Sequence, residues 1–262
     1  MTDIIVEDWL DLHDKLFRRV WQPGIRRFRA QLAYRGLSDA AWNLSTSLMR
    51  LGPGYDRLEK HLLRNFRKYA HRDAVPSDSN WNWLTLAQHH GLPTRLMDWT
   101  FSPYVAMHFA TADVNAFRLD GVIWAVDYVK VHAGLPEALR SELMEEGADL
   151  FTVEMLDRAA PAIDGLALIA DEPCLLFLEP SSVNDRVVNQ YALLSVVSHA
   201  TVGIDEWLAD HSDMFARYVI PAELKWEIRD KLDQANITER VLFPGLDGLS
   251  TWLKRNYTPR SE

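Results

Sequence analysis

The sequence contains a single cysteine, Cys174, so no disulfide bond can form within the chain. This cysteine lies in the apolar run PCLLFLEP, where a small buried side chain is more common than a reactive thiol. No uncharged apolar stretch is long enough to span a bilayer. The acidic start MTDIIVEDWLDLHDK lacks the basic segment and apolar core of a secretory signal. We therefore predict a cytoplasmic protein with no membrane partner.

Positive charge is also scarce, because 28 Lys and Arg residues stand against 37 Asp and Glu residues, for a net charge of −9. Nucleic-acid-binding domains are usually basic, since neutralising phosphates releases counterions, so this balance disfavours nucleic acid as a partner. One local exception is the basic helix 57–72, with Arg57, Lys60, Arg64, Arg67, Lys68 and Arg72. A solvated helix face explains this stripe, and the alternative is a protein-interaction domain that uses it to bind an acidic partner.

Several signatures of catalysis and metal binding are missing. The chain has no glycine-rich phosphate loop, no GxSxG elbow, no HExxH helix and no CxxC pair. His89, His90 and Asp98 do not predict a zinc site, because adjacent histidines point to different faces of a helix and no cysteine supports them. Internal repeats and low-complexity linkers are absent too, so residues 1–262 are predicted to form a single domain.

Hydrophobic periodicity predicts helices and strands that interleave irregularly along the chain. The predicted strands are 32–36, 94–99, 121–129, 174–180, 191–198 and 217–221, and the predicted helices are 6–21, 55–73, 79–90, 102–113, 135–147, 222–235 and 246–257. In the helix 55–73 the apolar face is expected to hold Leu58, Leu62, Phe66 and Tyr69. No regular strand–helix–strand rhythm emerges, so the pattern favours an α+β fold with a mixed or antiparallel sheet.

Two polar stretches interrupt this apolar pattern, and the first is AYRGLSDAAWNLSTSLMR, residues 33–50. Arg35 falls at the end of a predicted strand and is followed at once by Gly36. A glycine there lets a ligand approach the backbone, and an arginine offers a planar pair of donors to a pyrophosphate. Arg35 is equally explained as a structural residue paired with Asp39 or Asp98.

The second stretch is AQHHGLPTRLMDWTFSPYVAMHFA, residues 87–110. His89 and His90 end a helix, where a histidine can also bond the free carbonyl groups of the last turn. Arg95 and Asp98 are three apart, so on a strand they point to opposite faces and do not form one ion pair. Ser102 is explained as a helix N-cap. The remaining polar residues gather at a strand-to-helix junction, which indicates a small-ligand site.

Together, YRG at 34–36, the stretch 87–110 and LFPGLDGL at 242–249 closely resemble the FRG domain family, named for its Phe/Tyr-Arg-Gly motif. The resemblance spans about residues 20–256. That family is grouped with the ADP-ribosyltransferase-like superfamily. The implied fold is an ADP-ribosyltransferase-like split, mostly antiparallel β-sandwich core with surrounding helices, with a cleft for NAD between its two sheets.

The resemblance also implies an activity, in which NAD is the substrate of a mono-ADP-ribosyltransferase or an NAD glycohydrolase. Arg35, Thr100 and Gln190 are the implied catalytic residues, and Gln190 follows Arg186 in DRVVNQYALLSV, which is expected on a late strand. Trp99 or Tyr104 is expected to offer an aromatic face to nicotinamide. The full implied NAD-binding set is Tyr34, Arg35, Gly36, Ser38, His89, Thr94, Arg95, Asp98, Trp99, Thr100, Ser102 and Tyr104.

Gln190 departs from the glutamate that usually holds the ribose, because an amide carries no charge and cannot act as a base. Three explanations are open: a carboxylate such as Asp98 or Asp185 supplies the charge, the acceptor needs no base, or the chain binds NAD or ADP-ribose without turnover. The acceptor of ADP-ribose is likewise open between protein, nucleic acid, small molecule and water. A toxin-like role is common among superfamily relatives, which is an analogy only.

Overall fold

The computed structural model describes residues 3–18, 20–70, 75–181 and 185–259. The strands are β1 Asp3–Ile5, β2 Trp21–Gln22, β3 Arg27–Phe28, β4 Leu32–Leu37, β5 Met97–Thr100, β6 Gly121–Asp127, β7 Leu175–Leu178, β8 Ala192–Val197 and β9 Phe215–Ile220. The helices are α1 Trp9–Arg18, α2 Tyr55–Tyr69, α3 Asn80–His89, α4 Pro103–Ala110, α5 Tyr128–Ala133, α6 Glu137–Glu146, α7 Val153–Ala159, α8 Leu166–Ile169, α9 Asp185–Asn189, α10 Ile204–Ala209, α11 Lys225–Gln234, α12 Glu239–Leu242 and α13 Leu246–Asn256. Short 3-10 turns occur at Met49–Leu51, Val114–Ala116, Ile163–Gly165 and Ala222–Leu224.

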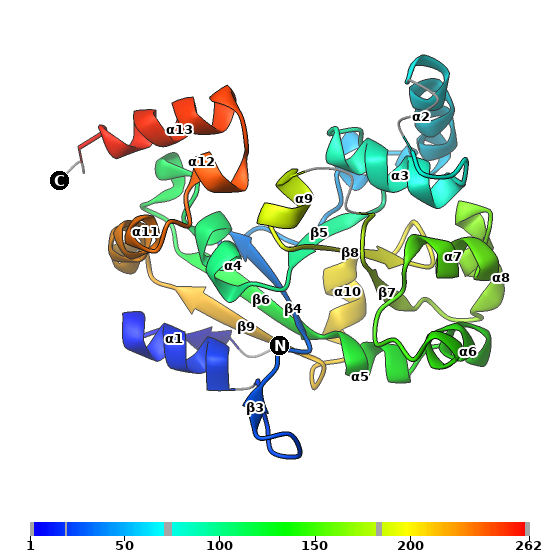
Figure 1. Cartoon of the computed structure of the whole chain (residues 1–262), viewed down its shortest axis with the longest axis horizontal. Coiled ribbons are helices and arrows are strands. Elements are labelled where there is room, and N and C mark those ends of the chain that lie inside the picture. Colours follow the sequence, from blue (N-terminus) through cyan, green and yellow to red (C-terminus); the bar gives the residue numbers. More distant parts are fainter. Residues whose placement is uncertain (1–2, 19, 71–74, 182–184, 260–262) are drawn as a thin grey trace.

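Seven strands form one sheet in the order β1-β9-β6-β4-β5-β8-β7, and β2 pairs with β3 in a separate hairpin. Only β1 and β9 run parallel; the other neighbouring strands of the main sheet are antiparallel. Helices cover both faces of this sheet (Figure 1). The predicted α+β fold with a mostly antiparallel sheet is therefore confirmed.

The two faces of the sheet are covered differently. On one face a continuous apolar layer runs from β9 and β6 to β8 and includes Val122, Trp124, Trp99 and Leu193, with α5 and α10 packed on it. On the opposite face the core is divided. One cluster joins α1, α4 and α11 to β4, β6 and β9, and another joins α2, α3, α6 and α7 to β7 and β8.

Strand β5 lies between those two helix groups. Side chains alternate along a strand, so Met97 and Trp99 enter the continuous core while Asp98 and Thr100 face the divided side. Register confirms this orientation, because Thr100 is paired with Tyr34 of one cluster and Asp98 with Leu194 of the other. The divided face therefore carries polar side chains at the seam between its two cores.

The pairing between neighbouring strands is shortest between β4 and β5. Strand β4 pairs with β6 at six positions, but with β5 only at Tyr34 and Thr100, after which the two strands diverge (Figure 1). Gly36, two residues past Tyr34, faces α4. A Cβ at this position would lie 1.9 Å from the carbonyl oxygen of Ala106, so β4 and α4 are in direct backbone contact. The close packing of α4 requires a glycine here, whereas the sequence had indicated ligand access.

Helix α2 differs from its predicted packing. Leu58 and Tyr69 were expected in the core, yet they are 41% and 79% exposed, whereas Glu59 and Leu63 are buried. Glu59 faces inward because it bonds the guanidinium of Arg95, with Oε2 2.6 Å from Nε. The ion pair with Arg95 thus turns the Glu59 side of α2 toward the core. Hydrophobic periodicity cannot predict this orientation, because the partner lies elsewhere in the chain.

The remaining differences concern short elements and the basic stripe. Residues 185–189 form helix α9, although residues 186–190 had been expected on a strand. Helices α7, α10 and α12 and the β2–β3 hairpin were not predicted. On the basic helix 57–72, Lys60 pairs with Asp164 and Arg67 with Asp78, and Arg72 lies outside the described residues.

We predict that Gly36→Ala destabilises the protein by about 1–3 kcal/mol or more, because the new methyl group overlaps the α4 backbone. Urea unfolding measures the change. Gly24→Ala is the matched control, since a Cβ there has no atom within 4 Å, and its effect should be small. Equal stability of the two variants would contradict the close β4–α4 packing.

The buried His132 predicts a pH dependence of stability. Its Nδ1 lies 2.8 Å from the carbonyl oxygen of Asp149 and its Nε2 accepts the amide N–H of Phe177 at 2.9 Å, so the folded state needs the neutral ring. Burial lowers the pKa of His132 to about 4. The stabilisation is present above the ordinary histidine pKa of about 6.5 and is lost as the pH falls toward 4, by up to roughly 3 kcal/mol.

Urea unfolding between pH 7 and pH 4.5 measures this loss. His132→Gln should flatten the decline without abolishing it, because burial also lowers the pKa of His108, to about 3. An unchanged pH profile in the variant would show that His132 is not responsible.

Candidate functional site

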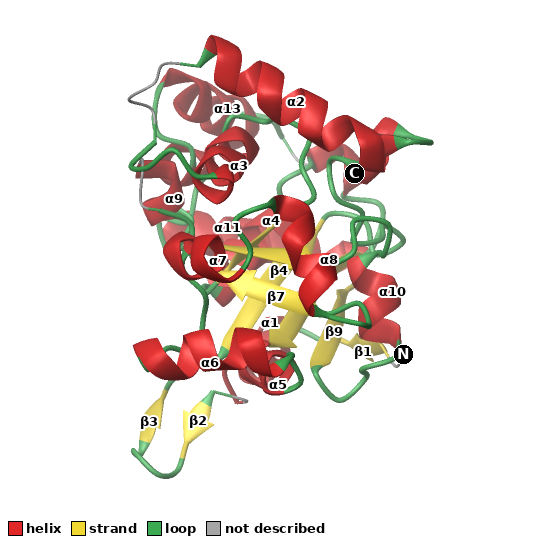
Figure 2. Cartoon of the chain, turned by 90° about the vertical axis from the view of Figure 1, so that its right-hand side faces the viewer, coloured by secondary structure: helices red, strands yellow, loops and turns green. Residues whose placement is uncertain are grey.

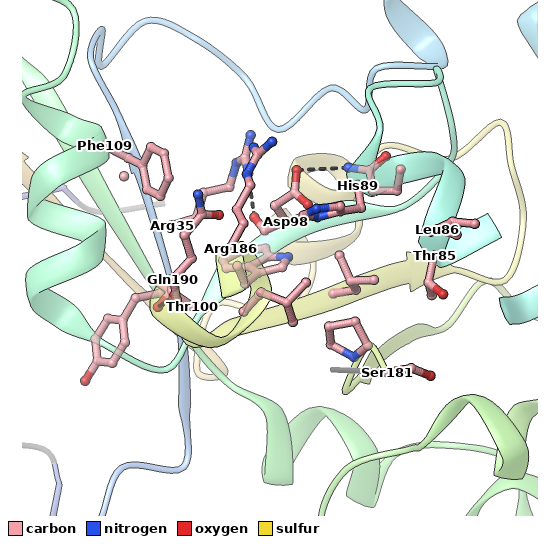
Figure 3. A pocket seen from close by; sticks show the side chains of 18 residues that line it. Arg35, Thr85, Leu86, His89, Asp98, Thr100, Phe109, Ser181, Arg186 and Gln190 are labelled. Atoms are coloured by element: carbon pink, nitrogen blue, oxygen red, sulfur yellow. Dashed lines mark hydrogen bonds between the residues drawn. The ribbon is translucent and has the colours of Figure 1, made fainter. Parts of the chain in front are cut away.

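A pocket of about 210 Å³ lies where β4 and β5 diverge, at the seam between the two cores of the divided face. We call it the fork pocket. Strands β4, β5 and β8 line it, together with α3, the end of α4, α9, Gln190 and Pro180–Ser181. Figure 3 shows side chains from these separate segments converging on it. The pocket therefore collects residues that are up to 160 positions apart, from Tyr34 to Leu194.

Arg35 bridges the two diverging strands. If the antiparallel ladder continued past Tyr34 and Thr100, Gly36 would lie opposite Asp98. Instead, the guanidinium Nη1 of Arg35 donates to the backbone carbonyl oxygen of Asp98 (Figure 3). The Nε of Arg35 is buried and has no hydrogen-bond partner among the described residues. A structural bond thus fixes this arginine while part of its donor capacity stays available to a ligand.

Asp98 is the only carboxylate among the residues that line the fork pocket. Its Oδ2 accepts a hydrogen bond from Gln88 Nε2 at 2.9 Å (Figure 3), and Gln88 Oε1 accepts in turn from Thr94 at 2.5 Å. Thr94 is fully buried and also receives the amide N–H of Leu96. This chain of hydrogen bonds holds the Asp98 carboxylate in a defined orientation.

His89 lies beside Asp98 at the end of α3. Burial lowers the pKa of His89 below the ordinary histidine value, the charges of Arg186 and His90 lower it further, and Asp98 opposes them. The ring is therefore neutral at neutral pH and can donate one hydrogen bond and accept another.

Thr100 closes the floor of the pocket. Its hydroxyl donates to the carbonyl oxygen of Gln190 at 2.7 Å and accepts the amide N–H of Ser102 at 3.0 Å. This side chain therefore ties the end of β5 to the segment that follows α9 and to the start of α4. Gln190 uses its side-chain amide elsewhere, because Nε2 donates to the carbonyl oxygen of Leu242 at 3.0 Å.

The C-terminal segment supports α9 from behind. Asn189 Nδ2 donates to the carbonyl oxygen of Val241 at 2.8 Å, one residue from the Gln190 contact, and the guanidinium of Arg186 lies 5.1 Å from the ring centre of Phe243. Helix α12 is itself anchored, since Glu239 pairs with Arg255 of α13. The start of LFPGLDGL thus positions the α9 wall and does not line the pocket itself.

Phe109 is a pocket residue that the sequence did not single out. It is half-buried at the end of α4 and lines the fork pocket (Figure 3). Its ring packs edge-on against Phe243. The two residues that had been expected to offer an aromatic face both make other contacts, although Trp99 also lines the pocket. The indole N–H of Trp99 donates to Ser195 inside the core, and the Tyr104 hydroxyl bonds His13 outside the pocket. Phe109 sits in an apolar helical run, where a core position was the simpler interpretation.

Seven residues of the predicted NAD-binding set line the fork pocket, namely Tyr34, Arg35, Gly36, His89, Asp98, Trp99 and Thr100, and so does Gln190. Tyr34 contributes little beyond its backbone, because its ring is fully buried in the core and its hydroxyl donates to the carbonyl oxygen of Leu16. Gly36 is explained by the packing of α4.

The other five residues of that set do not line the pocket: Ser38, Thr94, Arg95, Ser102 and Tyr104. Ser38 donates to the carbonyl oxygen of Phe109, and Ser102 is the predicted N-cap of α4. Arg95 is 6% exposed and pairs with Glu59 and Asp164, so it holds α2 to the segment before β5. As predicted, it does not pair with Asp98.

No group of three metal-binding side chains occurs among the described residues. Within the same residues, no helix has the length and apolar character needed to cross a bilayer. The fork pocket itself is lined by polar, aromatic and charged side chains.

Residues 30–118 match the family model of the FRG domain. This FRG region contains β4, α2, α3, β5 and α4, and therefore Arg35, His89, Asp98, Thr100 and Phe109. It supports the family that the motifs had indicated, over a shorter range than residues 20–256. The α9 wall and LFPGLDGL lie outside the matched range. No curated protein and no solved structure matches the chain.

We predict that Asn189→Ala loosens the α9 wall, because it removes the bond to Val241. The backbone amide of Gln190 should exchange with solvent about three- to tenfold faster, the range expected for one hydrogen bond. Val188→Ala, at a side chain that is 61% exposed, is the matched control and should leave exchange unchanged. Equal exchange in both variants would mean that α12 does not hold α9.

Proposed function

We propose that the chain is an NAD-dependent mono-ADP-ribosyltransferase or NAD glycohydrolase with an ADP-ribosyltransferase-like fold, and that NAD binds in the fork pocket. One observation carries this proposal: an arginine and a single carboxylate, Arg35 and Asp98, form the charged walls of a pocket where two sheet strands part. The FRG match over the residues that build these walls supports it.

NAD has an anionic part and a cationic part, and each needs a different partner in the pocket. Its diphosphate is anionic and calls for arginine donors, which Arg35 and Arg186 supply from two walls. Its nicotinamide ring is flat and cationic, and Phe109, Val187 and Leu194 give the pocket an aromatic and apolar portion. Together these walls offer complementary surfaces to the two ends of the molecule.

The proposed reaction breaks the bond between ribose C1′ and the nicotinamide nitrogen. The bonding electron pair moves to that nitrogen, so nicotinamide leaves as a neutral molecule, and the sugar becomes oxocarbenium-like, as in glycoside hydrolysis. An acceptor nucleophile then bonds to C1′ and releases a proton; with water as the acceptor, the product is free ADP-ribose. A fixed negative charge near the ribose stabilises this transition state.

Asp98 fits that electrostatic role better than Gln190. Gln190 is neutral and its side-chain amide bonds Leu242, whereas Asp98 lines the pocket with an orientation set by Gln88. Asp185 does not line the pocket. We therefore assign to Asp98 the negative field at the ribose and the role of base toward a protic acceptor. Gln190 and Thr100 then shape the floor.

We predict that Asp98→Asn slows nicotinamide release by about 100-fold or more, the scale for losing one electrostatic contact in a transition state. NAD affinity should change by less than about threefold, because the isosteric amide still accepts the Gln88 hydrogen bond. Release from radiolabelled NAD measures the rate, and calorimetry measures binding. Asp185→Asn is the matched control and should retain activity.

Each contrary result has a distinct meaning. Loss of activity in Asp185→Asn alone would transfer the charged role to Asp185. NAD binding by wild type without nicotinamide release, with protein, nucleic acid or water as acceptor, would indicate a non-catalytic NAD or ADP-ribose binding module. Absence of NAD binding by folded wild-type protein would reject the proposal, and the interaction hypothesis for the basic helix 57–72 would become the leading one.

A further inference from the structure

A second, more polar pocket adjoins the fork pocket on the other side of Arg35. It shares Arg35, Gln88, His89, Asp98 and Arg186 with the fork pocket. Its remaining walls come from the loop Ser45–Ser47, from Arg50 and from the α3–β5 connection around Gly91. We call it the arginine pocket.

The charge of the arginine pocket contrasts with that of the whole chain. The protein carries a net charge of −9, yet this pocket is lined by Arg35, Arg50 and Arg186 with Asp98 as the only carboxylate among its lining residues. Arg50 and Asp98 both act electrostatically on Arg35, and burial together with the Arg50 charge lowers the Arg35 pKa. The Arg186 charge helps to lower the pKa of His89. The Arg35 and Arg50 charges are therefore close enough to repel each other.

Other contacts hold these arginines in place despite that repulsion. Arg35 donates to the carbonyl oxygen of Asp98, Arg50 Nη1 donates to the carbonyl oxygen of Ser45 at 2.6 Å, and Arg186 lies over the Phe243 ring. Neither of the two carbonyl contacts neutralises a positive charge. A concentration of cationic donors, two of which bond carbonyl oxygens, favours a multiply charged anion, which would relieve the repulsion and accept several N–H groups.

We propose that the arginine pocket binds a phosphate group, with Arg35, Arg50 and Arg186 as its donors. A phosphate matches the pocket better than a carboxylate, because it brings more acceptor oxygens and more charge to three guanidinium groups. Two sources supply this chemistry: the diphosphate of a dinucleotide that reaches across from the fork pocket, or a separate phosphate-bearing compound. The first source rests on the function proposed above, whereas the preference for phosphate does not.

The test is calorimetric titration of the full chain with inorganic pyrophosphate at low ionic strength, where screening is weak. Arg50→Gln should weaken pyrophosphate binding by at least about tenfold, the loss expected for one charged hydrogen bond, and Arg50→Lys should restore part of it. Arg118→Gln removes an exposed arginine that lines neither pocket and should bind like wild type. Thermal unfolding of each variant verifies that the fold is intact.

A folded wild-type protein that does not bind pyrophosphate would overturn the inference, and so would equal binding by wild type and Arg50→Gln. A second titration, with ADP-ribose in the presence of saturating pyrophosphate, identifies the source. Mutual exclusion supports the dinucleotide diphosphate, and simultaneous binding supports a separate compound. Arg50-dependent pyrophosphate binding without nicotinamide release would uphold this inference while rejecting the enzymatic proposal, so the two fail independently.

Discussion

The single hydrogen-bonded position between β4 and β5 is the constraint on which the site depends. Beyond Tyr34 and Thr100 the strands part, and the Arg35 guanidinium takes the Asp98 carbonyl that a continued ladder would have used. Gly36 permits this divergence, because α4 packs directly against its backbone. The opening is thus stabilised by a helix on one side and an arginine across it. A sheet that stayed paired along its full width would leave no pocket at this point.

The divided packing on one face of the sheet also contributes to the opening of the pocket. Each half is covered by its own group of helices, and β5 between them presents Asp98 and Thr100 where apolar side chains would otherwise pack. The opposite face carries one continuous core, which joins the halves. The seam between the two cores on the divided face holds the fork pocket.

The walls of the site also depend on segments far apart in the chain. The FRG region contributes Arg35, Asp98 and Phe109, but α9 contributes Arg186, and α12 holds α9 through backbone carbonyl oxygens. Phe243 packs beneath Arg186 and against Phe109, so one side chain supports two walls. The matched region thus forms part of the pocket, and the C-terminal third completes it.

Local chemistry was sufficient to predict much of this protein from its sequence. Ser102 is the N-cap that was expected for α4, and the six predicted strands form because their alternation and apolar content suit a half-buried or buried sheet. The polar stretch between 87 and 110 supplies His89, Asp98 and Thr100 to the lining of the fork pocket.

Tertiary structure alone decided what each polar residue does. Both Arg35 and Arg95 lie in the polar stretches of the sequence. Arg95 is neutralised by the distant Glu59, whereas Arg35 bonds a carbonyl oxygen and forms no ion pair within the described part of the chain. For the same reason Phe109 lines the pocket without having been singled out in the sequence, while the Trp99 indole bonds Ser195 in the core. Whether a side chain is structural or available to a ligand depends on partners tens of residues away, which local periodicity and spacing do not encode.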